Sequence, residues 1–309
     1  MNAPAAAFDA RIIAVFGRDL LVRDAAGAQL RARPKGRRMN VVCGDDVRCE
    51  RDATHDEILV TETRPRQTAL YRSNTRGEAE AIVANISQLF VVLAPKPVPD
   101  LFVVDRYVAA ATSAHIIATL VLNKQDLPIE DELRTALTAY QKAGYRTLRC
   151  SAKAGDGVDT LIESNAGSVA ALVGQSGVGK SSLVRRLVPQ AQAEVGELDR
   201  DEEGRHTTTT SRMFDLPRGG HLIDSPGVRD FAPAIDKLDA RTLGFVEVDR
   251  LAPGCRFQDC QHMREPGCAV QKAAEGGALD ARRYESYRRM RRLFDELVKA
   301  RGPKYRPPN

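Results

Sequence analysis

The chain has 309 residues, of which 43% are hydrophobic and 28% charged, and its formal net charge is +5. This length suits two or three domains of ordinary size, each with its own hydrophobic core. No apolar run approaches the roughly 18 residues that a membrane-spanning helix needs, and residues 1–10 show neither the basic start nor the apolar stretch of a signal peptide. We therefore expect a soluble cytoplasmic protein with no membrane partner.

Short strands are predicted in the N-terminal part, at 11–16, 19–23, 29–32, 46–51 and 57–63, with turn residues between them. This spacing predicts an all-β barrel of the OB type over residues 1–69. Residues 31–38 form a basic stretch with one proline and one glycine. We interpret it as a loop that contacts nucleic-acid phosphates, since no aromatic ladder for stacking bases accompanies it.

Apolar strands and helices alternate over residues 70–235, which predicts an α/β domain with a parallel sheet. Buried strands are expected at 89–94, 117–122, 168–173 and 221–223, with a helix at 101–114. Polar motifs follow three of these strands. Because ligands bind at the carboxyl ends of parallel strands, these motifs are expected to meet at one edge of the sheet.

A complete phosphate-binding loop follows the strand at 168–173. It comprises Gly174, Gln175, Ser176, Gly177, Val178, Gly179, Lys180 and Ser181, with Ser182 next. The glycines let backbone N–H groups converge on phosphates, while Lys180 places a cation between the terminal ones. The Ser181 hydroxyl is the expected ligand of Mg²⁺.

A guanine-reading motif follows the strand at 117–122 and consists of Asn123, Lys124, Gln125 and Asp126. The Asp126 carboxylate can accept two hydrogen bonds from guanine N1–H and its 2-amino group, a pattern that adenine lacks. Asn123 is expected to brace the loop and meet the base edge, while the Lys124 stem covers the ring. Ser151, Ala152 and Lys153 fit the adjoining loop, in which the alanine N–H would reach the guanine oxygen.

Two switch segments complete the nucleotide motifs. Asp224-Ser225-Pro226-Gly227 would place Asp224 near Mg²⁺ through water and the Gly227 N–H near the γ-phosphate. Four consecutive threonines at 207–210 include Thr208, the favoured Mg²⁺ ligand, although the sequence does not separate the four. Val228 stands where Ras-like enzymes place a water-orienting glutamine. His206 is therefore the candidate for that catalytic role, with bracing of the switch or contact with a partner as the alternative.

The order of these motifs differs from that of Ras-like GTPases, where the phosphate-binding loop comes first and the guanine-reading motif late. Here the guanine-reading motif precedes the phosphate-binding loop, and the Asp224 motif comes last. The order predicts a circularly permuted GTPase. Its last strand then leads through residues 230–233 toward the C-terminal part, and we expect that path to transmit the nucleotide state.

The C-terminal part, residues 236–309, is predicted to be helical, with a last helix at 281–300. Its cluster of Cys255, Cys260, His262 and Cys268 offers three thiolates and one imidazole, a complete tetrahedral set for one structural Zn²⁺. From residue 281 onward ten lysines and arginines face three acidic residues, a surplus of +7 that suits either a polyanion or a solvated helix face. The remaining cysteines, Cys43, Cys49 and Cys150, are interpreted as small buried hydrophobes.

Together these motifs resemble the ribosome small subunit-dependent GTPase A (RsgA/YjeQ) family over nearly the whole chain. Further matches are residues 204–209, the zinc signature at 255–270 and the Arg283-Tyr284-x-Ser286-Tyr287 pattern, while Ser87 stands where aspartate is expected. The resemblance implies a late assembly factor of the small (30S) ribosomal subunit. Such a factor binds 16S rRNA and hydrolyses GTP to GDP and phosphate when docked on the subunit.

We expect a monomer that binds GTP or GDP with Mg²⁺. Two other functions stay open from the residues alone. In one, the protein is a binding scaffold in which GTP is structural and hydrolysis incidental. In the other, weaker one, it is a metal-trafficking GTPase, although the Cys/His set leaves no transfer position.

Overall fold

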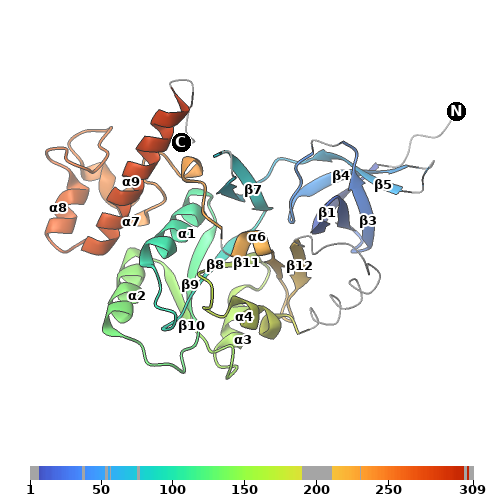
Figure 1. Cartoon of the computed structure of the whole chain (residues 1–309), viewed down its shortest axis with the longest axis horizontal. Helices are drawn as coiled ribbons and strands as arrows, with labels where there is room; N and C mark the ends of the chain where they lie inside the picture. Colours follow the sequence, from blue (N-terminus) through green and yellow to red (C-terminus); the bar gives the residue numbers. More distant parts are fainter. Residues whose placement is uncertain are drawn as a thin grey trace.

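The computed structural model describes residues 7–36, 39–52, 55, 57–74, 77–189, 211–229, 231–302 and 305. An N-terminal barrel and a C-terminal helical part lie at opposite ends of a central α/β core (Figure 1). No helix in these described ranges is long and apolar enough to cross a membrane.

The barrel has five strands: β1 (Ala7–Phe16), β2 (Asp19–Asp24), β3 (Gln29–Pro34), β4 (Asp46–Asp52) and β5 (Glu57–Thr63). Their order is β1-β2-β3-β5-β4, and β4 pairs back to β1 and closes the barrel. The β3–β5 pair is parallel and the others are antiparallel. Ile12, Val22, Val47 and Val60 are fully buried inside. This confirms the predicted OB barrel.

The basic stretch at 31–38 differs from the prediction, because residues 31–34 belong to strand β3 rather than to a loop. Ala32 points into the barrel core, and the polar residues beside it alternate outward as a strand requires. Arg33 donates to Asp19 at 2.8 Å, and Lys35 donates to Glu50 at 3.3 Å. Part of the basic charge is therefore paired within the barrel.

A hairpin that was not predicted connects the barrel to the core. Strands β6 (Ala69–Ser73) and β7 (Ala79–Ala84) form a two-stranded antiparallel sheet of their own. Asn74 makes the turn, because its side-chain oxygen accepts the Glu78 N–H. The last residues of β7 are buried and lead directly into the next apolar strand of the chain. In the sequence these two strands therefore look like one apolar segment.

The central sheet places strands in the order β10-β9-β8-β11-β13-β12. Its members are β8 (Gln88–Leu93), β9 (Ile117–Leu122), β10 (Arg146–Arg149), β11 (Val169–Val173), β12 (Ser211–Asp215) and β13 (His221–Asp224). All described neighbours are parallel except β12, which is antiparallel to β13. The strands predicted at 89–94, 117–122, 168–173 and 221–223 are confirmed.

Helices cover both faces of this sheet. Helices α1 (Leu101–Ser113) and α2 (Asp131–Ala143) pack on one face, and α3 (Val158–Ser164) and α4 (Lys180–Leu187) pack on the other. Strand β11 shows why: Ala171 and Val173 join the first cluster, whereas Ala170 and Leu172 join the second. A strand buried on both faces has the continuous apolar sequence that predicted a parallel sheet.

The barrel and the core share one sheet. Strand β1 pairs antiparallel with β12, with Ala14 opposite Arg212 and Val15 opposite Ser211. Arg23 of β2 adds two hydrogen bonds to the Asp215 carboxylate, at 2.9 and 3.0 Å. The result is a continuous eleven-stranded sheet, for which we found no signal in the sequence.

The chain leaves the core through helix α6 (Pro226–Arg229) and the short helix η1 (Ile235–Lys237). The C-terminal part then contains α7 (Val246–Leu251), η2 (Ala252–Gly254), α8 (Ala269–Glu275) and α9 (Ala281–Arg301). Asp280 caps α9 by accepting the Arg283 N–H. The predicted last helix is confirmed.

Candidate nucleotide and metal sites

The phosphate-binding loop joins β11 to α4, and its shape depends on Gly179. This residue has a φ of 97°, and a Cβ there would lie 2.3 Å from the Asn123 side-chain nitrogen. Only glycine permits both the left-handed backbone and this close approach. Buried Lys180 donates to the carbonyls of Gly174 at 2.5 Å and Gln175 at 2.8 Å, so its ammonium lies inside the loop.

The guanine-reading motif packs directly against this loop. Asn123 is buried, and its side-chain nitrogen donates to the Val178 carbonyl at 2.9 Å. Lys124 reaches the same loop and donates to the Gly177 carbonyl at 2.7 Å. The Gln125 N–H donates to the Cys150 carbonyl at 3.1 Å. Two motifs that lie about 50 residues apart in the chain therefore form one surface.

The Ser151 loop adjoins Asp126, as predicted. The Ser151 hydroxyl donates to the Asp126 carboxylate at 2.7 Å, and this hydrogen bond lowers the pKa of that carboxyl. Asp126 and Lys153 are exposed, which leaves them free to contact a base. The Ala152 N–H, expected to reach the guanine oxygen, instead donates to the Asn123 side-chain oxygen at 3.0 Å. That N–H is buried and needs an acceptor within the protein.

Asp224 lies at the end of β13, close to the start of α4. Arg229 donates through Nε to one Asp224 carboxylate oxygen at 2.8 Å and through a terminal nitrogen to the other. Its second terminal nitrogen donates to the Ser181 hydroxyl at 3.1 Å. Asp224 and Ser181, the two side chains expected near Mg²⁺, are thus brought together by one guanidinium.

The remaining described residues of the phosphate side lie in the loop after β11, in α4 and in α6. Gly227 is the second residue of α6, and Val228 beside it is 1% exposed and has no polar side-chain group that could orient a water molecule. Ser176 is exposed, and the Ser182 hydroxyl accepts a hydrogen bond from Arg185 at 3.1 Å. The predicted roles of His206 and Thr208 fall on residues outside the described ranges. Ser211, directly after that segment, hydrogen-bonds Ser225 at 2.6 Å.

The Cys/His cluster forms a compact site in the C-terminal part. The ligand atoms of Cys255, Cys260, His262 and Cys268 all lie within 4.8 Å of one another. The Cys255 and Cys268 sulfurs are 4.0 Å apart, and each is 3.5 Å from Nδ1 of His262. A zinc ion with bonds of about 2.3 Å to sulfur has S···S edges of roughly 3.8 Å. The four residues therefore fit a tetrahedral metal ion.

Neighbouring residues hold the cluster in place. The Glu265 carboxylate accepts backbone N–H groups of Gln261, Met263 and Arg264 at 2.8 to 2.9 Å, which shapes the loop between the ligands. The Tyr284 hydroxyl of α9 donates to the His262 carbonyl at 2.8 Å. These contacts, together with one from Tyr287 to Gln261, give the tyrosines of the Arg283-Tyr284-x-Ser286-Tyr287 pattern a structural role.

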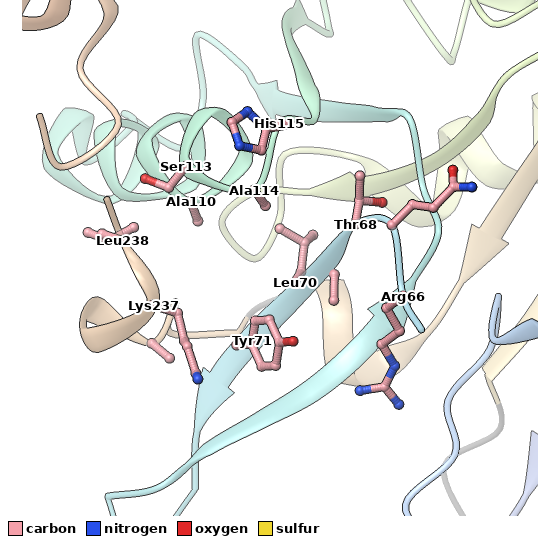
Figure 2. Close-up of a pocket in the computed structure, with 13 residues that line it drawn as sticks. Arg66, Thr68, Leu70, Tyr71, Ala110, Ser113, Ala114, His115, Lys237 and Leu238 are labelled. Carbon is pink, nitrogen blue, oxygen red and sulfur yellow. The ribbon is translucent and has the colours of Figure 1, made fainter. Parts of the chain in front are cut away.

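A separate pocket of about 290 Å³ lies between residues 66–71, the end of α1 and the segment around η1 (Figure 2). The β6 hairpin, the end of α1 and η1 line it, and the Lys237 ammonium stands 5.3 Å from the centre of the Tyr71 ring. None of the nucleotide motif residues lines this pocket. This pocket is therefore distinct from the nucleotide site.

Comparison with known proteins agrees with this geometry. The family model for the RsgA GTPase matches residues 63–233. The small ribosomal subunit biogenesis GTPase RsgA of Chromohalobacter salexigens is 42% identical over 289 residues, which cover 90% of this chain and 84% of that protein. The protein of the same name in Ectopseudomonas mendocina is 41% identical over 286 residues, covering 90% and 83%. The chain belongs to the RsgA GTPase family.

Two solved structures share the fold. YjeQ from Thermotoga maritima is 24% identical with a TM-score of 0.70, covering 95% of this chain and 99% of that one. YloQ, described as a circularly permuted GTPase, is 23% identical with a TM-score of 0.70, covering 99% of each chain. The chain therefore shares its fold with a protein described as circularly permuted. Its membership of the RsgA family makes it a GTP hydrolase.

Proposed function

We propose that the protein hydrolyses GTP to GDP and phosphate during late assembly of the small (30S) ribosomal subunit, while docked on it. The convergence of the Gly174 loop, the Asn123 motif, the Ser151 loop and Asp224 at one sheet edge supports the nucleotide part. The ribosomal part is supported by relatives that are named small ribosomal subunit biogenesis GTPases and span nearly the same length.

The roles of the nucleotide residues follow from their positions. Asp126 reads the guanine edge, and Asn123 fixes the distance between the base and phosphate loops. The N–H groups of residues 174–182 and the Lys180 ammonium bind phosphate, and Ser181 with Asp224 holds Mg²⁺. His206 and Thr208 keep their proposed roles as the water-orienting residue and the Mg²⁺ ligand of the first switch.

We assign one structural Zn²⁺ to Cys255, Cys260, His262 and Cys268. When bound, this ion would link the loop between η2 and α8 to the start of α8 without taking part in the reaction. The cluster gathers one buried and two half-buried thiols around one imidazole, and a bound cation would favour their thiolate form.

The barrel and the C-terminal part would contact 16S rRNA through phosphate-binding lysines and arginines, so that binding weakens with salt. We retain the division into an OB barrel at 1–69, a GTPase domain at 70–235 and a zinc domain at 236–309. The protein would act as a monomer, and the ribosomal role places it in the cytoplasm.

The test measures phosphate release from GTP with and without purified small subunits. We expect little turnover alone, because Val228 cannot orient water, and at least a tenfold rise with subunits, about 1.4 kcal/mol of barrier. Lys180→Ala should abolish GTP turnover both with and without subunits. Turnover that subunits do not stimulate would favour the scaffold in which GTP is structural.

A further inference from the structure

Arg229 occupies a position that the proposed reaction does not explain. It ends helix α6, two residues after Gly227, and its guanidinium contacts both Asp224 and Ser181. Three of its nitrogens are engaged, two on the carboxylate and one on the hydroxyl. This planar fork is the geometry in which arginine binds a carboxylate most strongly.

The same two oxygen donors suit a small divalent cation. Mg²⁺ binds hard oxygen ligands and, in phosphate-binding-loop GTPases, uses the hydroxyl of the loop and an aspartate at the end of a neighbouring strand. Ser181 and Asp224 are these residues in this chain. An arginine that already binds both of them competes for the same lone pairs.

We propose that Arg229 is a built-in counter-cation, which holds Asp224 and Ser181 in place until Mg²⁺ binds with the nucleotide and which must then release them. This inference rests on the proposed Mg²⁺–nucleotide site. The Arg229 side chain is 31% exposed and that of Asp224 is 19% exposed, so solvent screens their charges only in part. The Arg229 charge therefore offsets the repulsion between the Asp224 carboxylate and a bound phosphate.

Release of Arg229 from Asp224 and Ser181 is coupled to the switch segment Asp224-Ser225-Pro226-Gly227. Helix α6 is a single turn that begins at Pro226, directly after the Asp224-Ser225 pair, and Arg229 is its last residue. When the guanidinium is bound to Asp224, it ties the two ends of this segment together. Arg229 is therefore a positioning residue that biases the segment toward the conformation seen here.

The test is a thermodynamic cycle on the full-length protein. The dissociation constant of fluorescently labelled GDP is measured in excess Mg²⁺ and in EDTA, for the wild type and for Arg229→Met. In EDTA the variant should bind GDP more weakly, because Asp224 is left unpaired. In Mg²⁺ it should bind as well as the wild type or better. The dissociation constant in EDTA divided by that in Mg²⁺ should therefore be roughly three- to tenfold larger for Arg229→Met than for the wild type.

A direct measurement of the cation completes the test. Titration of the GDP complex with Mn²⁺, followed by electron paramagnetic resonance, should show roughly three- to tenfold tighter binding in Arg229→Met. The Mn²⁺ affinity of Arg229→Lys should fall between those of the wild type and Arg229→Met, because an ammonium cannot bridge Asp224 and Ser181 as a guanidinium does. Arg134→Met, which removes an exposed charge on α2, is the matched control and should leave both values unchanged. Thermal melting verifies that each variant is folded.

Two failures can be told apart. If the wild type binds GDP equally well with and without Mg²⁺, the proposed Mg²⁺–nucleotide site is wrong. If the wild type depends on Mg²⁺ but Arg229→Met shows the same ratio and the same or weaker Mn²⁺ binding, the nucleotide site stands and the role of Arg229 is refuted.

Discussion

At the scale of single residues, Asn123 carries more structure than its motif reveals. Its amide nitrogen binds the Val178 carbonyl and its oxygen binds the Ala152 N–H. Asn123→Ala would leave both buried groups unpaired, each costing about 1–3 kcal/mol. We predict a matching loss of unfolding free energy, measured by chemical denaturation, together with weaker GTP binding.

Asp126→Asn is the matched control for this prediction. Asp126 is exposed, so its substitution should weaken GTP binding while the unfolding free energy stays within about 0.5 kcal/mol of the wild type. Equal stability of Asn123→Ala and the wild type would show that Asn123 contacts only the base. The motif predicts that Asn123 braces the loop and that Asp126 reads the base, but only the structure identifies the Val178 carbonyl and the Ala152 N–H as the groups that Asn123 holds.

At the scale of elements, helix α9 corrects what its charge suggested. Arg283 is 1% exposed and donates to Asp105 of α1 at 2.6 Å and to Glu247 of α7 at 2.6 and 2.9 Å. Arg291 is also buried, and Arg282 pairs with Asp105. Arg282, Arg283 and Arg291 thus place part of the basic surplus against neighbouring elements instead of on a free face. Net charge cannot show this, because it does not distinguish the buried side of a helix from the exposed side.

This buried network predicts how the C-terminal part is attached to the core. Arg283→Met leaves the buried Glu247 carboxylate without its cation and leaves Asp105 with Arg282 alone, which should lower the unfolding free energy by about 3–5 kcal/mol. Adding Asp105→Asn and Glu247→Gln removes those charges and should restore part of the loss. Arg292→Met, which removes an exposed pair with Glu285, should cost less than about 1 kcal/mol. If calorimetry shows that Arg283→Met is as stable as the wild type, the buried Arg283 network does not attach the C-terminal part to the core.

At the scale of the whole molecule, motif order and strand periodicity predict the three parts correctly, because each rests on local patterns. The contacts between parts are different. The path at 230–233 is expected to transmit the nucleotide state to the C-terminal part. Arg283 adds a second contact between that part and the core, and β12 joins the core to the barrel. Pairing between strands that lie about 200 residues apart depends on tertiary geometry, which a single sequence does not display.

The shared sheet makes a prediction for the barrel. Strand β12 pairs with β13, where Arg212 lies opposite Asp224, and also with β1. A change at Asp224 therefore reaches the barrel through two rows of backbone hydrogen bonds. We predict that replacing GDP by a non-hydrolysable GTP analogue alters amide hydrogen exchange at residues 12–16 of β1. Exchange in the β3–β5 pair on the far side of the barrel should stay constant and serves as the internal control. If hydrogen exchange at residues 12–16 changes no more than it does in β5, the β1–β12 pairing is a rigid attachment. The nucleotide state is then transmitted only toward the C-terminal part.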